Sequence, residues 1–225
     1  DRLEKEKNDI LTEAIHTGAE LLNKGRYGEA RAALDSIDGS DLDDSEREQL
    51  LELRQRLDKE LFIQHVRSAL GSARSLKELI SLARSIRQRK QADDVTLDKL
   101  LQKAEERIRR ECSLTVFSAE GTRAVEEWVT PFSPERACLT PSGREVVAAM
   151  EAGERLFIRV SSVEGQGEVL ALLVPPGALG LQSVHVDDTH IWLLGRKGRV
   201  MKLFRDKFIP DLWYESDLLI LKGKP

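Results

Sequence analysis

The segment from residue 185 to residue 190 holds the side chains of this sequence most able to bind a metal ion. It reads His185, Val186, Asp187, Asp188, Thr189 and His190. Neighbouring side chains of a strand point to opposite faces, so these groups converge on one ion only if the chain turns between them. An Asp-Asp pair is also common in turns. The sequence therefore favours a turn, and a metal-dependent hydrolase using His185 and His190 is the third-ranked hypothesis.

The two cysteines, Cys112 and Cys138, are the other candidates for chemistry. A cysteine nucleophile needs a base beside it, and no local pattern supplies one. The sequence also lacks a phosphate loop, a nucleophile elbow and a dinucleotide fingerprint. We therefore predict a binding or regulatory protein without a catalytic centre, a metal or a cofactor.

A strongly basic segment lies between Gly195 and Lys207. One acid, Asp206, accompanies its six basic residues, which are Arg196, Lys197, Arg199, Lys202, Arg205 and Lys207. Three interpretations remain open: a solvated hairpin with charged edges that resist aggregation, a nucleic-acid patch, and a segment that recognises a protein. The interleaved Val200, Leu203 and Phe204 suit a strand with one buried face, which makes direct nucleic-acid binding the less favoured interpretation.

Residues 199 to 204, Arg-Val-Met-Lys-Leu-Phe, resemble the cleaved region of the accessory regulatory proteins of type III-E CRISPR systems. Those proteins are substrates of a CRISPR-associated caspase-like protease that an RNA-guided effector activates. The resemblance implies cleavage between Met201 and Lys202. It also implies a protein that restrains a sigma factor until it is cut during antiviral defence. The implied recognition residues are Arg196, Lys197, Arg199, Val200, Leu203 and Phe204.

Cleavage of this kind sets a structural condition. A protease draws about eight residues into an extended strand in its cleft, and a strand inside a sheet cannot follow without local unfolding. The basic residues favour an edge strand, in which the bond after Met201 would be accessible. The second-ranked hypothesis, which needs no cleavage, is a constitutive helical scaffold for protein partners.

Length and composition predict the organisation around these residues. The chain has 225 residues, of which 33% are charged and 5% aromatic, with a formal net charge of −4. The length predicts two domains, and the change from helical to strand-like spacing of apolar residues predicts an α+β protein, with a helical array over residues 1–112 and a β-rich α+β domain over residues 113–225. The separated cysteines and the lack of a long apolar run favour the cytoplasm and no membrane span.

Apolar residues at helical spacing predict five helices in the N-terminal half. They cover residues 10–22, 27–37, 45–61, 75–86 and 96–108. Capping boxes at Ser45 with Glu48 and at Ser75 with Glu78 open two of them. The pattern Gly18, Gly25, Tyr27, Ala30 and Leu34 resembles one tetratricopeptide unit, although a generic pair of antiparallel helices explains it equally well.

Two further basic clusters lie in this half. They are Arg84, Arg87, Arg89 and Lys90, followed by Arg107, Arg109 and Arg110. Both fall at predicted helix C-termini, where the helix dipole favours cations, and we prefer that interpretation to a phosphate-binding surface.

The C-terminal half changes to strand-like periodicity. We predict one helix over residues 141–152, between the cap-like Thr140 and Gly153, and then strands over residues 156–161, 169–174, 185–186, 191–194, 199–204 and 218–221. The first two strands should pair as a hairpin. Residues 196–198 should form a tight turn in which Gly198 takes a positive φ.

Overall fold

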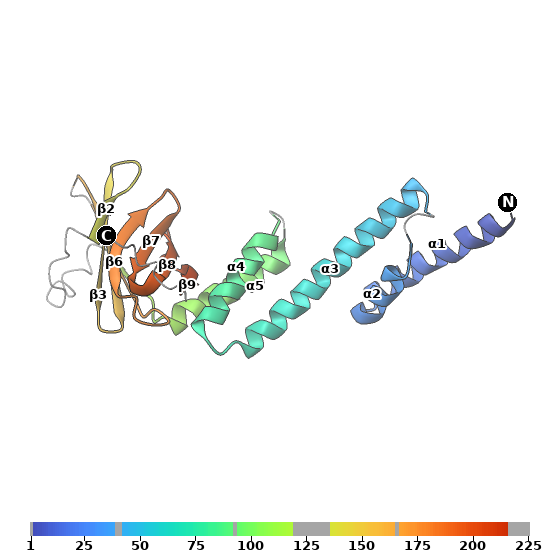
Figure 1. The fold of residues 1–225 in the computed structure, drawn as a ribbon, viewed down its shortest axis with the longest axis horizontal. Coiled ribbons are helices and arrows are strands. Elements are labelled where there is room, and N and C mark those ends of the chain that lie inside the picture. The colour runs from blue at the N-terminus through green and yellow to red at the C-terminus, as the bar shows by residue number, and fades with distance from the viewer. Residues whose placement is uncertain (1, 39–41, 92–93, 119–135, 165–166, 216–225) are drawn as a thin grey trace, which may run out of the picture. The chain divides into compact units, whose positions relative to one another are not determined.

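The computed structural model describes residues 2–38, 42–91, 94–118, 136–164 and 167–215. Helices precede two antiparallel sheets, which confirms the α+β class (Figure 1). The chain divides into two compact units, residues 1–68 and 69–225. Two of the helices thus group with the strands, whereas the sequence division was placed at residue 112; that domain boundary stays a prediction.

The first unit is built from α1 (Arg2–Asn23), α2 (Tyr27–Asp35) and most of α3 (Asp44–Ser72). Gly25 has a φ of +72°, a conformation that glycine adopts without strain, and it ends the turn after α1. Gly18 faces Leu34 so closely that an added Cβ would lie 2.8 Å from the Leu34 Cγ. The two helices therefore approach through a missing side chain, as the sequence pattern predicts.

The core of this unit is formed by apolar side chains, beside which Arg54 on α3 donates to the carbonyls of Leu34 and Ile37. Tyr27 packs against its edge, and the Tyr27 hydroxyl donates to the Glu60 carboxylate over 3.4 Å. The buried members are Ile15, Leu22, Ala30, Leu34, Ile37, Leu42, Leu50 and Leu57. These residues match the helical faces read from the sequence.

The cap of α3 lies two residues before the predicted position. Asp43 Oδ1 accepts the backbone N–H of Glu46 at 2.7 Å, and Glu46 Oε2 accepts the N–H of Asp43 at 3.2 Å. The predicted capping box of Ser45 and Glu48 is therefore wrong, because an aspartate upstream supplies the same reciprocal pair of bonds.

The second unit contains α4 (Leu76–Arg89) and α5 (Val95–Glu111), which form an antiparallel hairpin (Figure 1). Ser75 caps α4 by accepting the N–H of Glu78, as predicted. Asp94 caps α5 by accepting the N–H of Leu97 at 3.0 Å.

A sheet of five strands follows in the order β1-β5-β4-β3-β2. Its strands are β1 (Thr115–Ser118), β2 (Ala137–Leu139), β3 (Glu145–Ala152), β4 (Arg155–Ser162) and β5 (Glu168–Leu173). The β4–β5 hairpin confirms the predicted pairing.

The predicted helix over residues 141–152 is wrong, because this stretch forms the strand β3. Thr140 and Gly143 instead belong to the tight turn between β2 and β3, where Gly143 has a φ of +70°. Gly153, with a φ of +62°, lies in the two-residue turn to β4. The β-branched Val146 and Val147 suit the strand, and turn residues at both ends resemble helix caps in sequence.

The second sheet is a meander in the order β6-β7-β8-β9. Its strands are β6 (Leu181–Val186), β7 (His190–Gly195), β8 (Val200–Phe204) and β9 (Pro210–Tyr214). The turn at residues 196–198 is confirmed, and both Lys197 and Gly198 have a positive φ. The predicted strand at residues 218–221 lies outside the described residues.

Two contacts within the second unit join its layers. The Glu151 carboxylate on β3 accepts the N–H groups of Leu179 and Leu181, at 2.6 and 2.8 Å, and so ties one sheet to the other. Arg107 on α5 binds the carbonyls of Leu70 and Ala73 and satisfies the C-terminal end of α3. Among the residues that the structure describes, no helix has the length and apolar character to cross a membrane.

Candidate functional site

The bond between Met201 and Lys202 lies in the middle of the second sheet. Strand β8 pairs with β7 on one side and with β9 on the other, and Met201 is 0% exposed. The expectation that the basic residues mark an edge strand is therefore wrong. Their charges do not protect a free edge, because other elements of the same unit neutralise them.

The predicted recognition residues divide into an exposed turn and a packed strand. Arg196 and Lys197 are exposed in the turn before β8. Arg199 Nε lies 3.1 Å from the Glu215 carboxylate, and Leu203 is fully buried. Val200 and Phe204 are half-buried on the other face of β8. The structure thus leaves only the turn residues of this set open to solvent.

A network of half-buried charges joins the helical hairpin to the second sheet. Asp211 on β9 accepts from Arg87 on α4 at 2.6 Å, and Arg87 also donates to Glu105 on α5 at 2.9 Å. Lys207 donates to the same Glu105 at 2.7 Å, and Lys202 Nζ lies 3.5 Å from Asp211. Each carboxylate in the network therefore meets two cations, a balance that a partly buried site requires.

Aromatic rings complete the network. The Arg87 guanidinium lies 4.3 Å from the centre of the Phe204 ring, and Lys207 Nζ lies 4.9 Å from it. Lys202 Nζ lies 4.8 Å from the centre of the Trp192 ring. Cations over ring faces are attracted by the negative π surface. Lys202, Phe204 and Lys207 of the basic segment thus stabilise the second unit itself.

Electrostatics support this assignment of the charges. Burial opposes ionisation of Glu105, but hydrogen bonds from Lys207 and Arg87 outweigh it and lower the pKa of that carboxyl. Arg205, a further basic residue of the segment, forms an ion pair with Glu145 on β3. Acids of the same unit therefore pair with Arg199, Lys202, Arg205 and Lys207, whereas Arg196 and Lys197 are exposed in the turn.

The predicted turn at Asp187 and Asp188 is confirmed. The Asp187 carboxylate accepts from the Trp192 indole N–H at 2.8 Å and from the backbone N–H groups of Thr189 and His190. The indole bond is the largest cause that lowers the pKa of Asp187, and the two backbone bonds add to it. This carboxylate therefore holds the turn together.

His190 faces the charge network from β7. Its Nδ1 lies 2.7 Å from the Thr189 hydroxyl, and its Nε2 lies 3.7 Å from Asp211. Burial is the main cause that lowers the pKa of His190, and the nearby Lys202 adds to it. In the described part of the chain no three or more His, Cys, Asp or Glu side chains lie close enough to hold a metal, so the structure gives the hydrolase hypothesis at His185 and His190 no site.

The cysteines occupy different environments. Cys112 is buried at the end of α5, and burial raises the pKa of its thiol to about 11, which keeps it protonated at neutral pH. Cys138 lies in the edge strand β2, and its thiol contacts the carbonyl of Leu139 at 3.3 Å. The two cysteines, both among the described residues, form no disulfide.

The basic clusters of the helices lie where the sequence predicts. Arg87 and Arg89 are in the last turn of α4, and Arg109 and Arg110 are in the last turn of α5. In addition, Lys90 pairs with Asp98 at the start of α5. These positions fit the dipole interpretation, and Arg87 has the further role in the network.

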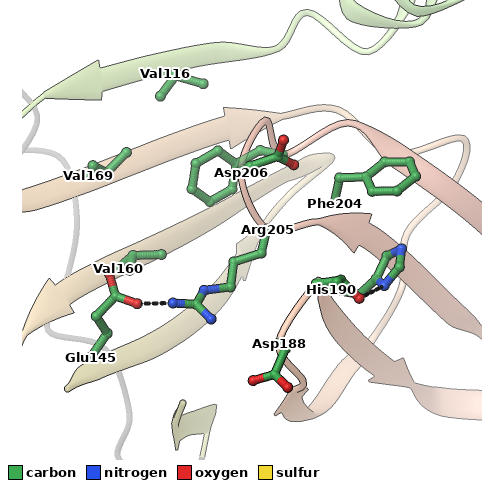
Figure 2. A pocket seen from close by; sticks show the side chains of 11 residues that line it. Val116, Glu145, Val160, Val169, Asp188, His190, Phe204, Arg205 and Asp206 are labelled. Atoms are coloured by element: carbon green, nitrogen blue, oxygen red, sulfur yellow. Dashed lines mark hydrogen bonds and ion pairs between the residues drawn. The ribbon is translucent and has the colours of Figure 1, made fainter. Parts of the chain in front are cut away.

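A cleft of about 860 Å³ opens beside His190 at one end of the space between the two sheets (Figure 2). Val116, Val160 and Val169 form one wall, each from a different strand of the first sheet. The opposite side carries Phe204, Phe208 and His190. Asp188, Thr189 and Asp206 add polar groups, and the Arg205–Glu145 ion pair crosses the cleft (Figure 2).

Sequence reasoning missed both the network and the cleft. Arg87 follows Ile80 and Ala83 at seven- and four-residue spacing, so its place on the buried face of α4 was readable. Its partner Asp211 lies 124 residues away, and no local pattern links the two. The valines of the cleft come from three strands whose order is set by the fold, not by the sequence order.

Comparison of this chain with protein-family models, with curated proteins and with solved structures found no match. The tetratricopeptide and CRISPR resemblances thus gain no support from relatives. A function must be argued from the residues and contacts of this chain.

Proposed function

We propose that the chain is a non-enzymatic regulatory protein that binds other proteins and is switched by cleavage between Met201 and Lys202. By resemblance, the protease would be a CRISPR-associated caspase-like enzyme and the restrained partner a sigma factor. One observation carries the proposal: the residues after Met201 supply the charged and aromatic contacts that tie α4 and α5 to the second sheet.

Three ion pairs make this connection. Arg87 pairs with Asp211, Glu105 pairs with Lys207, and Lys77 pairs with Glu215. In each pair the sheet-side partner follows the proposed cut. Trp213, which Lys77 Nζ approaches within 5.9 Å of the ring centre, also follows it. A cut before Lys202 would leave these groups on a segment held only by non-covalent contacts.

Loss of the covalent link changes the energetics of that segment. In the intact chain, β8 and β9 are held beside β7 at a high effective concentration, which a cut removes. The cleaved segment can then dissociate and take with it the partners of Arg87 and Glu105. The helical hairpin would lose its charged contacts with the sheet, which is a direct route from cleavage to altered partner binding.

The cut requires an opening step, because β8 is a central strand. β9 is the edge strand of the sheet, and its departure would make β8 the new edge. That departure breaks the Arg87–Asp211 pair, so the charge network should control access to the bond. The rate of cleavage should accordingly rise as the free energy of this local opening falls.

The test is digestion of the full chain by the activated protease, with the cut mapped by mass spectrometry. We expect one cut between Met201 and Lys202, and faster cutting in the Arg87→Gln variant because β9 opens more often. Arg84→Gln is the matched control, since Arg84 lies exposed on the same helix. A synthetic peptide of residues 196–207 reports the activity of the protease on the unfolded sequence.

Cutting of the peptide together with full resistance of both folded variants would refute the proteolytic switch. The second candidate, a constitutive scaffold, would then be favoured. A groove of about 400 Å³ in the first unit supports that alternative, with Ile15 and Ala19 on α1 and Leu53 on α3 among its lining residues. Helix-lined apolar grooves commonly bind an amphipathic helix of a partner.

A further inference from the structure

The cleft beside His190 has the shape of a binding site. Its volume of about 860 Å³ lies within the range of ligand sites in proteins. Val116, on the edge strand β1, is 48% exposed, whereas Val160 in the same wall is 9% exposed and Val169 is half-buried. The described residues therefore leave part of this apolar wall open at this end of the first sheet.

The dimensions of the cleft fit a short stretch of extended chain. Its lining residues Val116, Val169, Val160 and Glu145 come from the neighbouring strands β1, β5, β4 and β3 (Figure 2). Strands lie about 4.8 Å apart, so three spacings give a length of about 14 Å. An extended peptide of four residues is about 13 Å long.

The charge of the cleft selects the kind of ligand. Three carboxylates line it against one guanidinium, and the guanidinium of Arg205 is paired with Glu145. Asp188 and Asp206 are exposed at separate points of the rim (Figure 2). His190 adds no positive charge at neutral pH, because burial lowers its pKa. The excess is negative, which disfavours nucleic acid and favours a cation.

We propose that this cleft binds an extended peptide segment of a partner protein in which aliphatic residues are flanked by lysine or arginine. The aliphatic side chains would lie on the valines of the first sheet, and the cations would pair with Asp188 and Asp206. Binding at this site does not require the proposed cleavage, because the intact chain already forms the cleft.

The test measures fluorescence anisotropy of two labelled pentapeptides with the full chain. The first is lysine-valine-leucine-valine-arginine, and the second replaces both cations by glutamate. We expect the basic peptide to bind at least about tenfold more tightly, with an affinity that falls as salt is added. The double substitution Asp188→Asn with Asp206→Asn should weaken binding of the basic peptide by about tenfold or more. Glu154→Gln, which removes one carboxylate from the exposed turn after β3, is the control and should leave binding unchanged.

A further variant tests the apolar wall. Val116→Ser replaces an exposed side chain, so the fold should persist, and binding of the basic peptide should weaken. Equal affinity for the two peptides, or no change in the double variant, would overturn the proposal. Competition by hexylammonium as strong as that of the basic peptide would also overturn it, since the site would then take a small amphipathic cation. Circular dichroism of each variant checks that the fold is intact.

Discussion

The contact within the first helical hairpin and the contact between the second hairpin and its sheet are of opposite kinds. In the first unit, α1 and α2 approach through Gly18 and Leu34, and the interior is apolar. In the second unit, the hairpin of α4 and α5 meets the sheet through Arg87, Asp211 and Glu105. The first contact depends on shape, and the second depends on charge as well as on packing.

This difference predicts which part of the molecule can be regulated. Close apolar packing responds little to salt or pH, because no group in it ionises. A half-buried charge network responds to both, and removal of one member leaves the others uncompensated. The second hairpin is therefore the better candidate for a contact that is broken and reformed.

The largest expected effect is that of Asp211→Asn. The Asp211 carboxylate is 10% exposed and faces Arg87, Lys202 and His190. Its neutralisation removes the counter-charge of Lys202 and one of the two counter-charges of Arg87, and we expect a loss of about 3 kcal/mol in the unfolding free energy of the second unit. Urea unfolding followed by tryptophan fluorescence measures this directly, because Trp192 and Trp213 lie in that unit.

The control for this substitution is Asp98→Asn on α5. Asp98 pairs with Lys90 at a position that is 40% exposed, where an ion pair contributes about 0 to 1 kcal/mol. Equal losses of unfolding free energy in Asp211→Asn and Asp98→Asn would show that the half-buried network contributes no more than an exposed ion pair. The contrast between the hairpins would then disappear.

A smaller effect is expected from Gly18→Ala in the first unit. The new Cβ would collide with the Leu34 side chain, and overpacking of this kind costs about 1 to 3 kcal/mol. The loss should appear in circular dichroism at 222 nm and leave tryptophan fluorescence unchanged, because the tryptophans lie in the second unit.

Gly28→Ala on α2 is the matched control for the close approach. An added Cβ there meets nothing within 4 Å, so the change should stabilise the helix by up to about 1 kcal/mol. If Gly18→Ala were also stabilising, Leu34 would be free to move aside, and the first hairpin would not depend on shape.

The same contrast explains what the sequence could predict. The first hairpin was readable because Gly18, Ala30 and Leu34 follow a helical period over a short stretch. The segment over residues 141–152 was misread because Thr140 followed by proline, and then Gly153, serve equally well as helix caps and as turns. Local chemistry leaves that choice open, and the pairing of β3 with β4 decides it.

The candidate sites were less predictable than the elements. The basic segment is visible in the sequence, but its partners Glu105, Glu145 and Asp211 lie on other elements, and a sequence pattern cannot pair them. The edge or centre position of β8 depends on β9, which residue types near Met201 do not specify. The cleft depends on sheet order in the same way. Contacts between residues far apart in the sequence therefore determine the ion-pair partners, the central position of β8 and the cleft.

The smallest expected effect is a pH dependence of the stability of the second unit, which we assign to His190. Its pKa is lowered in the folded state by burial and by Lys202 and Arg87, against the raising influence of Asp211 and Asp187. The unfolded chain then binds the proton more readily. The stabilisation is complete above the unfolded pKa of about 6.5, and it is lost as pH falls through the lower folded pKa. Glu105 loses its own stabilisation only below its ordinary value of about 4.5.

We therefore expect the urea midpoint from tryptophan fluorescence to fall as the pH is lowered below about 6.5, with no matching change in the first unit. His190→Gln should remove this pH dependence, whereas His185→Gln, at an exposed position of β6, should keep it. A pH dependence that survives in His190→Gln would assign the titration to another group of the network. A midpoint that rises as pH falls would mean that Asp211 and Asp187 outweigh burial at this histidine.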